Sequence, residues 1–175
     1  MKKLFLILFS SVFFTSAIVV LPDQSEEATA HIKSIYIYNF TKYIEWPDTY
    51  REGNFVIGFM GSNTSLFNEL AKLNTKKVGN QNIEIKNITS VDANSKFNII
   101  YILPDNSAQL ADVLSKVKGK STLIVTDKPG LAKQGSGINF VFLENKQKIE
   151  VNRSNIEKYK LKVAITLVEM SMPVN

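Results

Sequence analysis

Few side chains in this chain could do acid–base or nucleophilic chemistry. The 175 residues include one histidine, His31, and no cysteine. His31 stands next to a candidate signal cleavage site, where a general base would be poorly held, so an ordinary surface histidine is favoured over a catalytic one. The lack of cysteine excludes disulfides, thiolate nucleophiles and Cys-ligated metals. The sequence therefore predicts a protein that is not an enzyme and has no catalytic residues, cofactor or metal.

Three polar residues lie where an α/β protein could hold a ligand. Asp105 and Asp127 each come just after a predicted buried strand, and Asn139 lies in a third strand-like run. The carboxyl edge of a parallel sheet is a frequent ligand site. We therefore predict a small-ligand site at these three residues. The alternative is that Asp105 caps the next helix and Asp127 only starts a turn.

One loop imitates a phosphate-binding motif. The segment "GLAKQGSG", residues 130–137, has the glycine spacing of a P-loop, but Ser136 stands where the lysine is required. It also precedes a strand, so its amides lack the helix N-terminus that would bind phosphate. The motif is rejected, and its glycines are expected to allow a tight strand entry.

The elements that must position these residues follow from the spacing of apolar side chains. Residues 30–46 have helical spacing with a core stripe at Ile32, Ile35, Phe40 and Ile44, and Pro47 ends the helix. Buried strands are predicted in residues 54–61, 97–105 and 121–130, an edge strand in 82–88, and helices in 65–73 and 107–119. Thr64 or Ser65 is the expected cap of the first of these helices.

The last quarter of the chain has a different pattern. Residues 137–152 form two strand-like runs around a short polar turn, which predicts an antiparallel hairpin. Ser154 and Glu157 then have the spacing of a capping box, and apolar residues from Ile156 to Met170 predict one final helix. The fold class is therefore α/β. We expect a single-domain sandwich with a mostly parallel central sheet covered by helices, plus a C-terminal hairpin and final helix.

The N-terminus reads as an export signal. Two lysines precede an uncharged apolar run from Leu4 to Leu21, and small residues follow at Ala28–Ala30. We predict a signal peptide in residues 1–30, with Thr15-Ser16-Ala17 as a second candidate cut, and one domain in residues 31–175. The alternative is an uncleaved membrane anchor, because the run is about long enough to span a bilayer. The mature chain is predicted to be soluble and to lie outside the cytoplasm.

The net charge of the chain limits the classes of partner that it is expected to bind. Without residues 1–30 the chain keeps 19 basic and 13 acidic residues, a net charge of +6. No nucleic-acid motif is present, and an exported protein has little access to nucleic acid. An acidic partner or an anionic lipid surface fits better.

The first helix also has a second face. Tyr38, Lys42 and Trp46 are spaced to lie together on it, and Tyr and Trp are favoured anchors of protein contacts. We therefore predict that these three residues bind a partner. The alternative is that Trp46 covers the end of the sheet.

Several segments, taken in order, resemble one known family. The segments "YIYNFTKYIEWP", "FVIGFMG", "TLIVTDKPGLAKQGSGINFV" and "QKIEVNRSNIEKYKLKV" are similar to the YfiR-like family of bacterial periplasmic regulatory proteins. The resemblance implies an α/β sandwich that tends to dimerise and has no enzymatic activity. It also implies binding to the periplasmic sensor part of an inner-membrane signalling protein, a diguanylate cyclase or a sensor kinase. Repression of the cyclase would lower cyclic di-GMP and restrain biofilm formation. The alternative function is a periplasmic small-molecule sensor or solute-binding module.

Two features depart from the family pattern. The chain lacks the cysteines of redox-sensitive members, so disulfide regulation is not expected. Lys160 stands where family sequences often have glycine. Either Lys160 takes a left-handed conformation, at about 1–2 kcal/mol, or the final helix runs straight through.

Overall fold

Runs of buried aliphatic and aromatic residues form the central sheet. The structure is a computed structural model, and it describes residues 24–174. Seven strands occur in the order β3-β4-β2-β5-β6-β7-β8. Neighbouring strands from β4 to β7 are parallel, whereas β3 and β8 are antiparallel to their neighbours. The strands are β2 (Phe55–Met60), β3 (Lys77–Val78), β4 (Gln81–Asn87), β5 (Ile99–Ile102), β6 (Leu123–Thr126), β7 (Ile138–Leu143) and β8 (Lys146–Val151).

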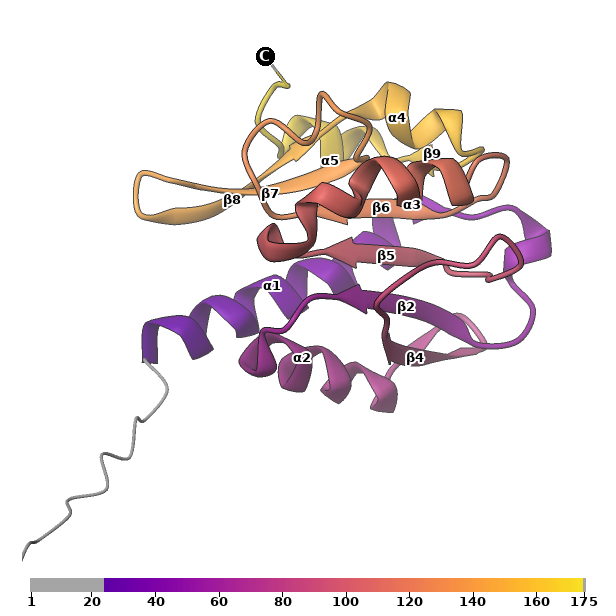
Figure 1. Cartoon of the computed structure of the whole chain (residues 1–175), viewed down its shortest axis with the longest axis horizontal. Helices are drawn as coiled ribbons and strands as arrows, with labels where there is room; N and C mark the ends of the chain where they lie inside the picture. The colour runs from indigo at the N-terminus through magenta and orange to yellow at the C-terminus, as the bar shows by residue number, and fades with distance from the viewer. Residues whose placement is uncertain (1–23, 175) are drawn as a thin grey trace, which may run out of the picture.

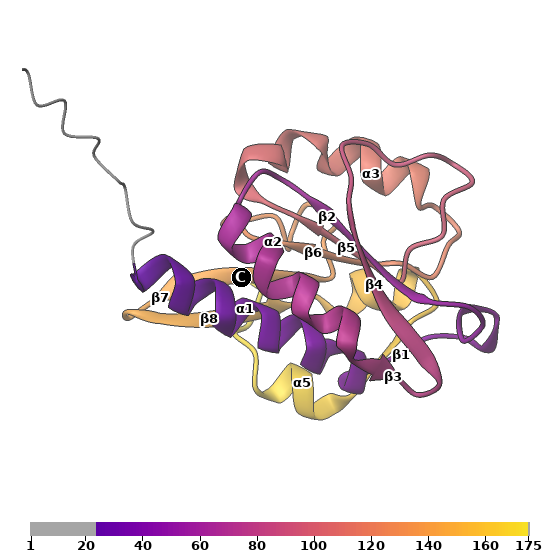
Figure 2. The same cartoon turned by 90° about the horizontal axis from the view of Figure 1, so that it is seen from below.

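Helices cover both faces of this sheet. The helices α1 (Gln24–Tyr43) and α2 (Thr64–Ala71) lie side by side on one face, and α3 (Leu110–Lys116) lies on the other (Figures 1 and 2). Every residue of β5 and β6 is buried, as expected for strands between two helical layers. The predicted α/β class and mostly parallel sheet are confirmed.

The core stripe of α1 differs from the predicted one. Phe40 and Ile44 are buried as expected, and Ile37 is buried beside them. Ile32 and Ile35, however, are 42% and 46% exposed, so their assignment to the core is wrong. In the N-terminal half of the helix the buried positions are instead taken by two small residues, Ala30 and Ser34, and both isoleucines lie on another face.

The end of α1 also differs. The helix stops at Tyr43, and the next residues form β1 (Ile44–Glu45), which pairs antiparallel with β9 (Lys162–Val163). Trp46 therefore lies beyond the helix and does not share a helical face with Tyr38 and Lys42. The predicted common face is wrong, because backbone pairing with β9 replaces the last helical turn.

Two of the expected helix caps are wrong. The side chain of Asn63 caps α2 by accepting a hydrogen bond from the Leu66 amide, whereas Thr64 or Ser65 was expected. Asn152 caps α4 (Arg153–Lys158) in the same way through the Asn155 amide, where Ser154 was expected. Asparagine is as good a cap as serine, so the residue types could not decide between neighbouring positions. Before α3, the 3₁₀ turn η3 (Pro104–Gln109) takes up the first part of the predicted helix.

The hairpin of β7 and β8 is confirmed. Its two turn residues, Glu144 and Asn145, both have positive φ, as a two-residue type I′ turn requires. The single final helix is wrong. The chain forms α4, then β9, then α5 (Ile165–Glu169), and Lys160 has a φ of 58° between α4 and β9. The left-handed alternative for Lys160 is therefore the one adopted.

The predicted signal peptide lies only partly within the described residues. The candidate cut at Ala17 lies outside them. The candidate at Ala28–Ala30 lies inside α1, where Ala30 is only 3% exposed. Among residues 24–174, no helix combines the length and the apolar character needed to cross a membrane.

Candidate functional site

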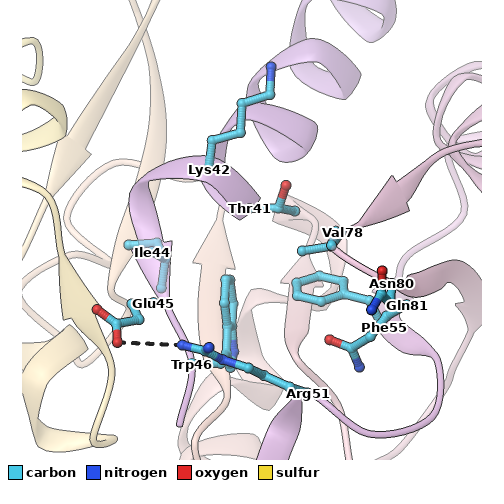
Figure 3. A pocket seen from close by; sticks show the side chains of 11 residues that line it. Thr41, Lys42, Ile44, Glu45, Trp46, Arg51, Phe55, Val78, Asn80 and Gln81 are labelled. Atoms are coloured by element: carbon cyan, nitrogen blue, oxygen red, sulfur yellow. Dashed lines mark ion pairs between the residues drawn. The ribbon is translucent and has the colours of Figure 1, made fainter. Parts of the chain in front are cut away.

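A recess of about 500 Å³ lies at the C-terminal end of α1 (Figure 3). Its walls come from α1, β1, the loop after Pro47, the start of β2, and the turn between β3 and β4. The lining residues are Thr41, Lys42, Ile44, Glu45, Trp46, Arg51, Phe55, Val78, Gly79, Asn80 and Gln81. The recess thus lies at the end of the sheet where β2 and β4 begin.

Two aromatic rings form its apolar floor. Trp46 and Phe55 meet edge to face, with ring centroids 4.9 Å apart. The indole Nε1 of Trp46 donates a hydrogen bond to the carbonyl oxygen of Asn98 at 3.2 Å. Trp46 is only 5% exposed and is held in a fixed orientation. Only a small part of Trp46 therefore remains for contact with another molecule.

Charged side chains form the rim. A guanidinium nitrogen of Arg51 lies 3.5 Å from Glu45, and Nε of the same residue lies 3.4 Å from Asp48. Lys162 from β9 also approaches Glu45 at 3.5 Å. The loop carrying Arg51 is tied down by Gln81, whose amide donates hydrogen bonds to the carbonyl oxygens of Tyr50 and Gly53. An apolar floor with a few polar groups around it is typical of binding sites.

The residues predicted to bind a partner are only partly brought together. Lys42 and Trp46 both line the recess, and Tyr38 does not. Tyr38 instead lies beneath Lys42, whose ammonium nitrogen is 4.8 Å from the centre of the ring. Lys42 also donates a hydrogen bond to the Asn39 side chain at 3.1 Å. Tyr38 and Lys42 thus form one surface beside the recess, and Trp46 contributes to the recess from within.

Sequence reasoning missed the ion pair between Arg51 and Glu45. No periodic pattern links these residues, because the turn after Pro47 brings them together. The β3–β4 turn that supplies Asn80 comes from a distant part of the chain, and its place in the recess depends on the sheet order.

Two of the three predicted ligand residues meet at the opposite end of the sheet. Asp105 and Asp127 line a second hollow, of about 460 Å³. Asp127 accepts hydrogen bonds from Lys33 at 2.5 Å and from the hydroxyl of Tyr101 at 3.1 Å. Burial, with the nearby charge of Asp127 and this hydrogen bond, raises the pKa of Tyr101 well above its ordinary value.

Asn139 does not line that hollow. It is fully buried, and its side-chain oxygen accepts hydrogen bonds from the Thr126 hydroxyl and the Lys128 amide. Its side-chain nitrogen donates to Glu150 at 2.9 Å. Asn139 thus contacts the Thr126 side chain and the Lys128 backbone, on either side of Asp127, and helps to position this turn.

The histidine lines neither hollow. His31 Nδ1 is 3.0 Å from Glu69 on α2, on the surface. Hydrogen bonds from Lys72 and His31 lower the pKa of Glu69. Within residues 24–174, no group of three or more His, Asp or Glu side chains could hold a metal ion.

Comparison with known proteins identifies the family. The sequence profile described as YfiR/HmsC-like matches residues 30–172, nearly the whole described chain. The chain belongs to the YfiR/HmsC-like family. Proteins of this family are periplasmic regulators without catalytic activity. No curated protein matches the sequence closely.

Proposed function

We propose that this YfiR/HmsC-like protein binds the periplasmic sensor part of an inner-membrane signalling protein and holds it inactive. A diguanylate cyclase is the partner that the family resemblance favours, so that binding would lower cyclic di-GMP and restrain biofilm formation. A sensor kinase is the other candidate for this inner-membrane partner. Family membership across residues 30–172 supports this regulatory role.

The recess at the end of α1 is the observation that carries the proposal. It combines a rigid aromatic floor with charged side chains at its rim, and Tyr38 and Lys42 extend it onto the outer surface of α1. Tyr, Trp and Arg are the residues that most often dominate the binding energy of protein interfaces. A side chain of the partner fits the recess, with Tyr38 and Lys42 contacting the surface around it. Association of the chain with itself through this surface is the related proposal, and it agrees with the tendency of the family to dimerise.

A double substitution tests this surface. Tyr38→Ala with Lys42→Glu removes one ring and reverses one charge. Lys42 is exposed, and Tyr38 is only partly buried against the core. Association should weaken by about 2 kcal/mol or more, roughly 30-fold, because interface anchors carry most of the binding energy. The measurements are sedimentation of the protein alone and titration with the purified periplasmic domain of the signalling protein encoded beside it.

Two controls make the result interpretable. Lys118→Glu reverses an exposed charge just after α3, on the other face of the sheet, and should leave association unchanged. Phe40→Ala should cost about 3–5 kcal/mol of folding stability, because its side chain is fully buried. If the double variant melts like Phe40→Ala, its loss of binding reports unfolding. If it melts normally and still binds fully, the contact surface lies elsewhere.

A further inference from the structure

The hollow that contains Asp105 and Asp127 lies where the strand order of the sheet reverses. The chain runs outward from β2 to β4 and then returns to β5 on the other side of β2. The connections after β2 and β5 leave toward opposite faces, to α2 and to α3 (Figure 2). In open α/β sheets, diverging connections of this kind leave a crevice at the carboxyl ends of the two strands, and ligands bind there.

The walls of the hollow come from the two diverging segments. Ser62 and Asn63 follow β2, and Leu103 to Asp105 follow β5. Leu66 adds apolar surface from α2, while Lys33 and Asp127 close one side. The volume of about 460 Å³ is in the range of small-molecule sites.

The charged side chains of the hollow differ in whether they already form an ion pair. The side chains of Lys33 and Asp127 are each 14% exposed and pair with one another at 2.5 Å, and Asp127 also accepts the Tyr101 hydroxyl. The positive charge of Lys33 is thus neutralised by Asp127. Asp105 is exposed, its carboxylate accepts a hydrogen bond from the Ser62 hydroxyl at 2.9 Å, and among residues 24–174 no cationic group forms an ion pair with it. The net charge of the lining residues is −1, from two carboxylates and one ammonium group.

We infer that this hollow binds a small organic cation whose ammonium group pairs with Asp105. The apolar surface of Leu66, Leu103 and Pro104 would contact the carbon chain of the ligand, while Lys33 and Asp127 neutralise one another and leave Asp105 as the net negative charge. An anion would meet the uncompensated Asp105. A calcium ion usually takes about six to eight oxygen ligands, more than the two carboxylates here provide, and one of these already pairs with Lys33. This inference does not depend on the proposed function, because the recess at the end of α1 lies at the opposite end of the strands.

The test is a titration of ¹⁵N-labelled protein, followed by amide chemical shifts, with 1,4-diaminobutane as the probe at constant ionic strength. We expect saturable shifts confined to residues 62–66, 103–106 and 127–128. Glutarate, a dianion with a five-carbon chain, should produce no saturable shift there. Asp105→Asn keeps the shape of the side chain and its ability to accept from Ser62, but should weaken binding about tenfold because the charge is lost.

Asp48→Asn is the matched control. Asp48 is 94% exposed and lies beside the recess at the other end of the sheet, so its loss should leave the diamine affinity unchanged. The Tyr38→Ala, Lys42→Glu variant should also bind the diamine normally, which separates this site from partner binding. Equal affinity of Asp105→Asn and the wild type would overturn the inference. Shifts spread over all acidic surfaces, or no saturable shift at all, would do the same.

Discussion

Lys160 is the residue at which local strain is most clearly stored. Its φ of 58° is a conformation that costs a non-glycine residue about 1–2 kcal/mol, and the chain needs it to turn from α4 into β9. Lys160→Gly should therefore stabilise the protein by about 0.5–1 kcal/mol, after the greater flexibility of glycine in the unfolded chain is deducted. Chemical denaturation would measure the change.

Lys158→Gly is the matched control for this substitution. Lys158 is also an exposed lysine, but it is the last residue of α4. Glycine there should destabilise the protein, by up to about 1 kcal/mol. The same sign for both variants would show that the backbone at position 160 is not strained.

The buried hydroxyl of Tyr101 should make stability sensitive to alkaline pH. Burial and Asp127 keep its pKa well above the ordinary value, whereas tyrosine in the unfolded chain ionises near pH 10. Above about pH 10 the folded chain therefore retains a proton that the unfolded chain loses. Stability is unaffected below that pH and falls above it, by up to about 1.4 kcal/mol per pH unit for this one group.

Tyr101→Phe tests that contribution. The variant should lose about 1 kcal/mol at pH 7, because the hydrogen bond to Asp127 is removed. Its unfolding free energy should then fall less steeply than that of the wild type between pH 10 and 11. Tyr159, whose pKa is also raised by burial, contributes to the slope that remains. Parallel pH profiles of the two proteins would refute the assignment.

Single residues were also where sequence reasoning was weakest. The burial of Phe40 and Ile44 was predicted, since large apolar side chains at helical spacing usually face the core. Ile32 and Ile35 were assigned to the same stripe and are exposed, because the small residues Ala30 and Ser34 occupy the buried face of this part of α1. Trp46 was placed on the wrong surface for a related reason. Spacing predicts a shared face only while the helix continues, and here it ends at Tyr43.

At the scale of elements, Asn152 links the start of α4 to the loop that contains Ala132. It should therefore stabilise the protein more than an ordinary helix cap does. Its oxygen accepts the Asn155 amide at the start of α4, and its nitrogen donates to the Ala132 carbonyl at 3.0 Å. Asn152→Ala should cost about 1–2 kcal/mol, at the upper end of the range for caps. Ser154→Ala, at the position that the sequence favoured, should change stability by less than about 0.5 kcal/mol. Thermal melting of the two variants measures the difference. Equal losses of stability would indicate that Ser154 also caps α4.

The buried strands and the hairpin were predictable because their signals are local. The strands β5 and β6 are continuous apolar runs, and β7 and β8 flank a short polar turn. The break of the last helix was not decided by such signals. The apolar spacing from Ile156 to Met170 fits a helix, yet β1 pairs with β9 and draws Lys162 and Val163 into an extended strand. That pairing is between residues more than a hundred positions apart, so no local pattern reports it.

On the scale of the whole molecule, the sheet order decides which predicted residues share a site. Asp105 and Asp127 follow neighbouring strands, so the expectation that they lie close together needed only a parallel sheet. The recess at the other end depends on the end of α1, the loop after Pro47 and the β3–β4 turn, which meet beside the start of β2. The sequence could not place these segments together before the topology was known. Both hollows are formed by connections at the ends of strands, and the buried middle of the sheet supports them.

The extent of the folded domain bears on where the predicted signal peptide would be cut. Residues 24–30 belong to α1, in which Ala30 is buried and Glu26 accepts a hydrogen bond from Asn63 at 3.1 Å. A cut after Ala30 would remove almost two turns of this helix and the contact with the cap of α2. We therefore expect cleavage upstream of Gln24, with Ala17 as the favoured site. Intact-mass measurement of protein from a periplasmic extract tests this expectation. A mature chain that begins at His31 would contradict it, and a mass that includes Met1 would indicate an uncleaved anchor.

The same argument predicts the effect of the shorter N-terminus on folding. A chain that begins at His31 should melt several degrees below one that begins at Ile18, because it loses the burial of Ala30 and the first turns of α1. A loss of about 1–2 kcal/mol corresponds to roughly 2–8 °C in a domain of this size. The partner's affinity for the two chains should be similar, since Tyr38, Lys42 and the recess lie at the other end of α1. Equal melting temperatures would show that residues 24–30 do not stabilise the fold. Cleavage after Ala30 would then again be compatible with a stable domain.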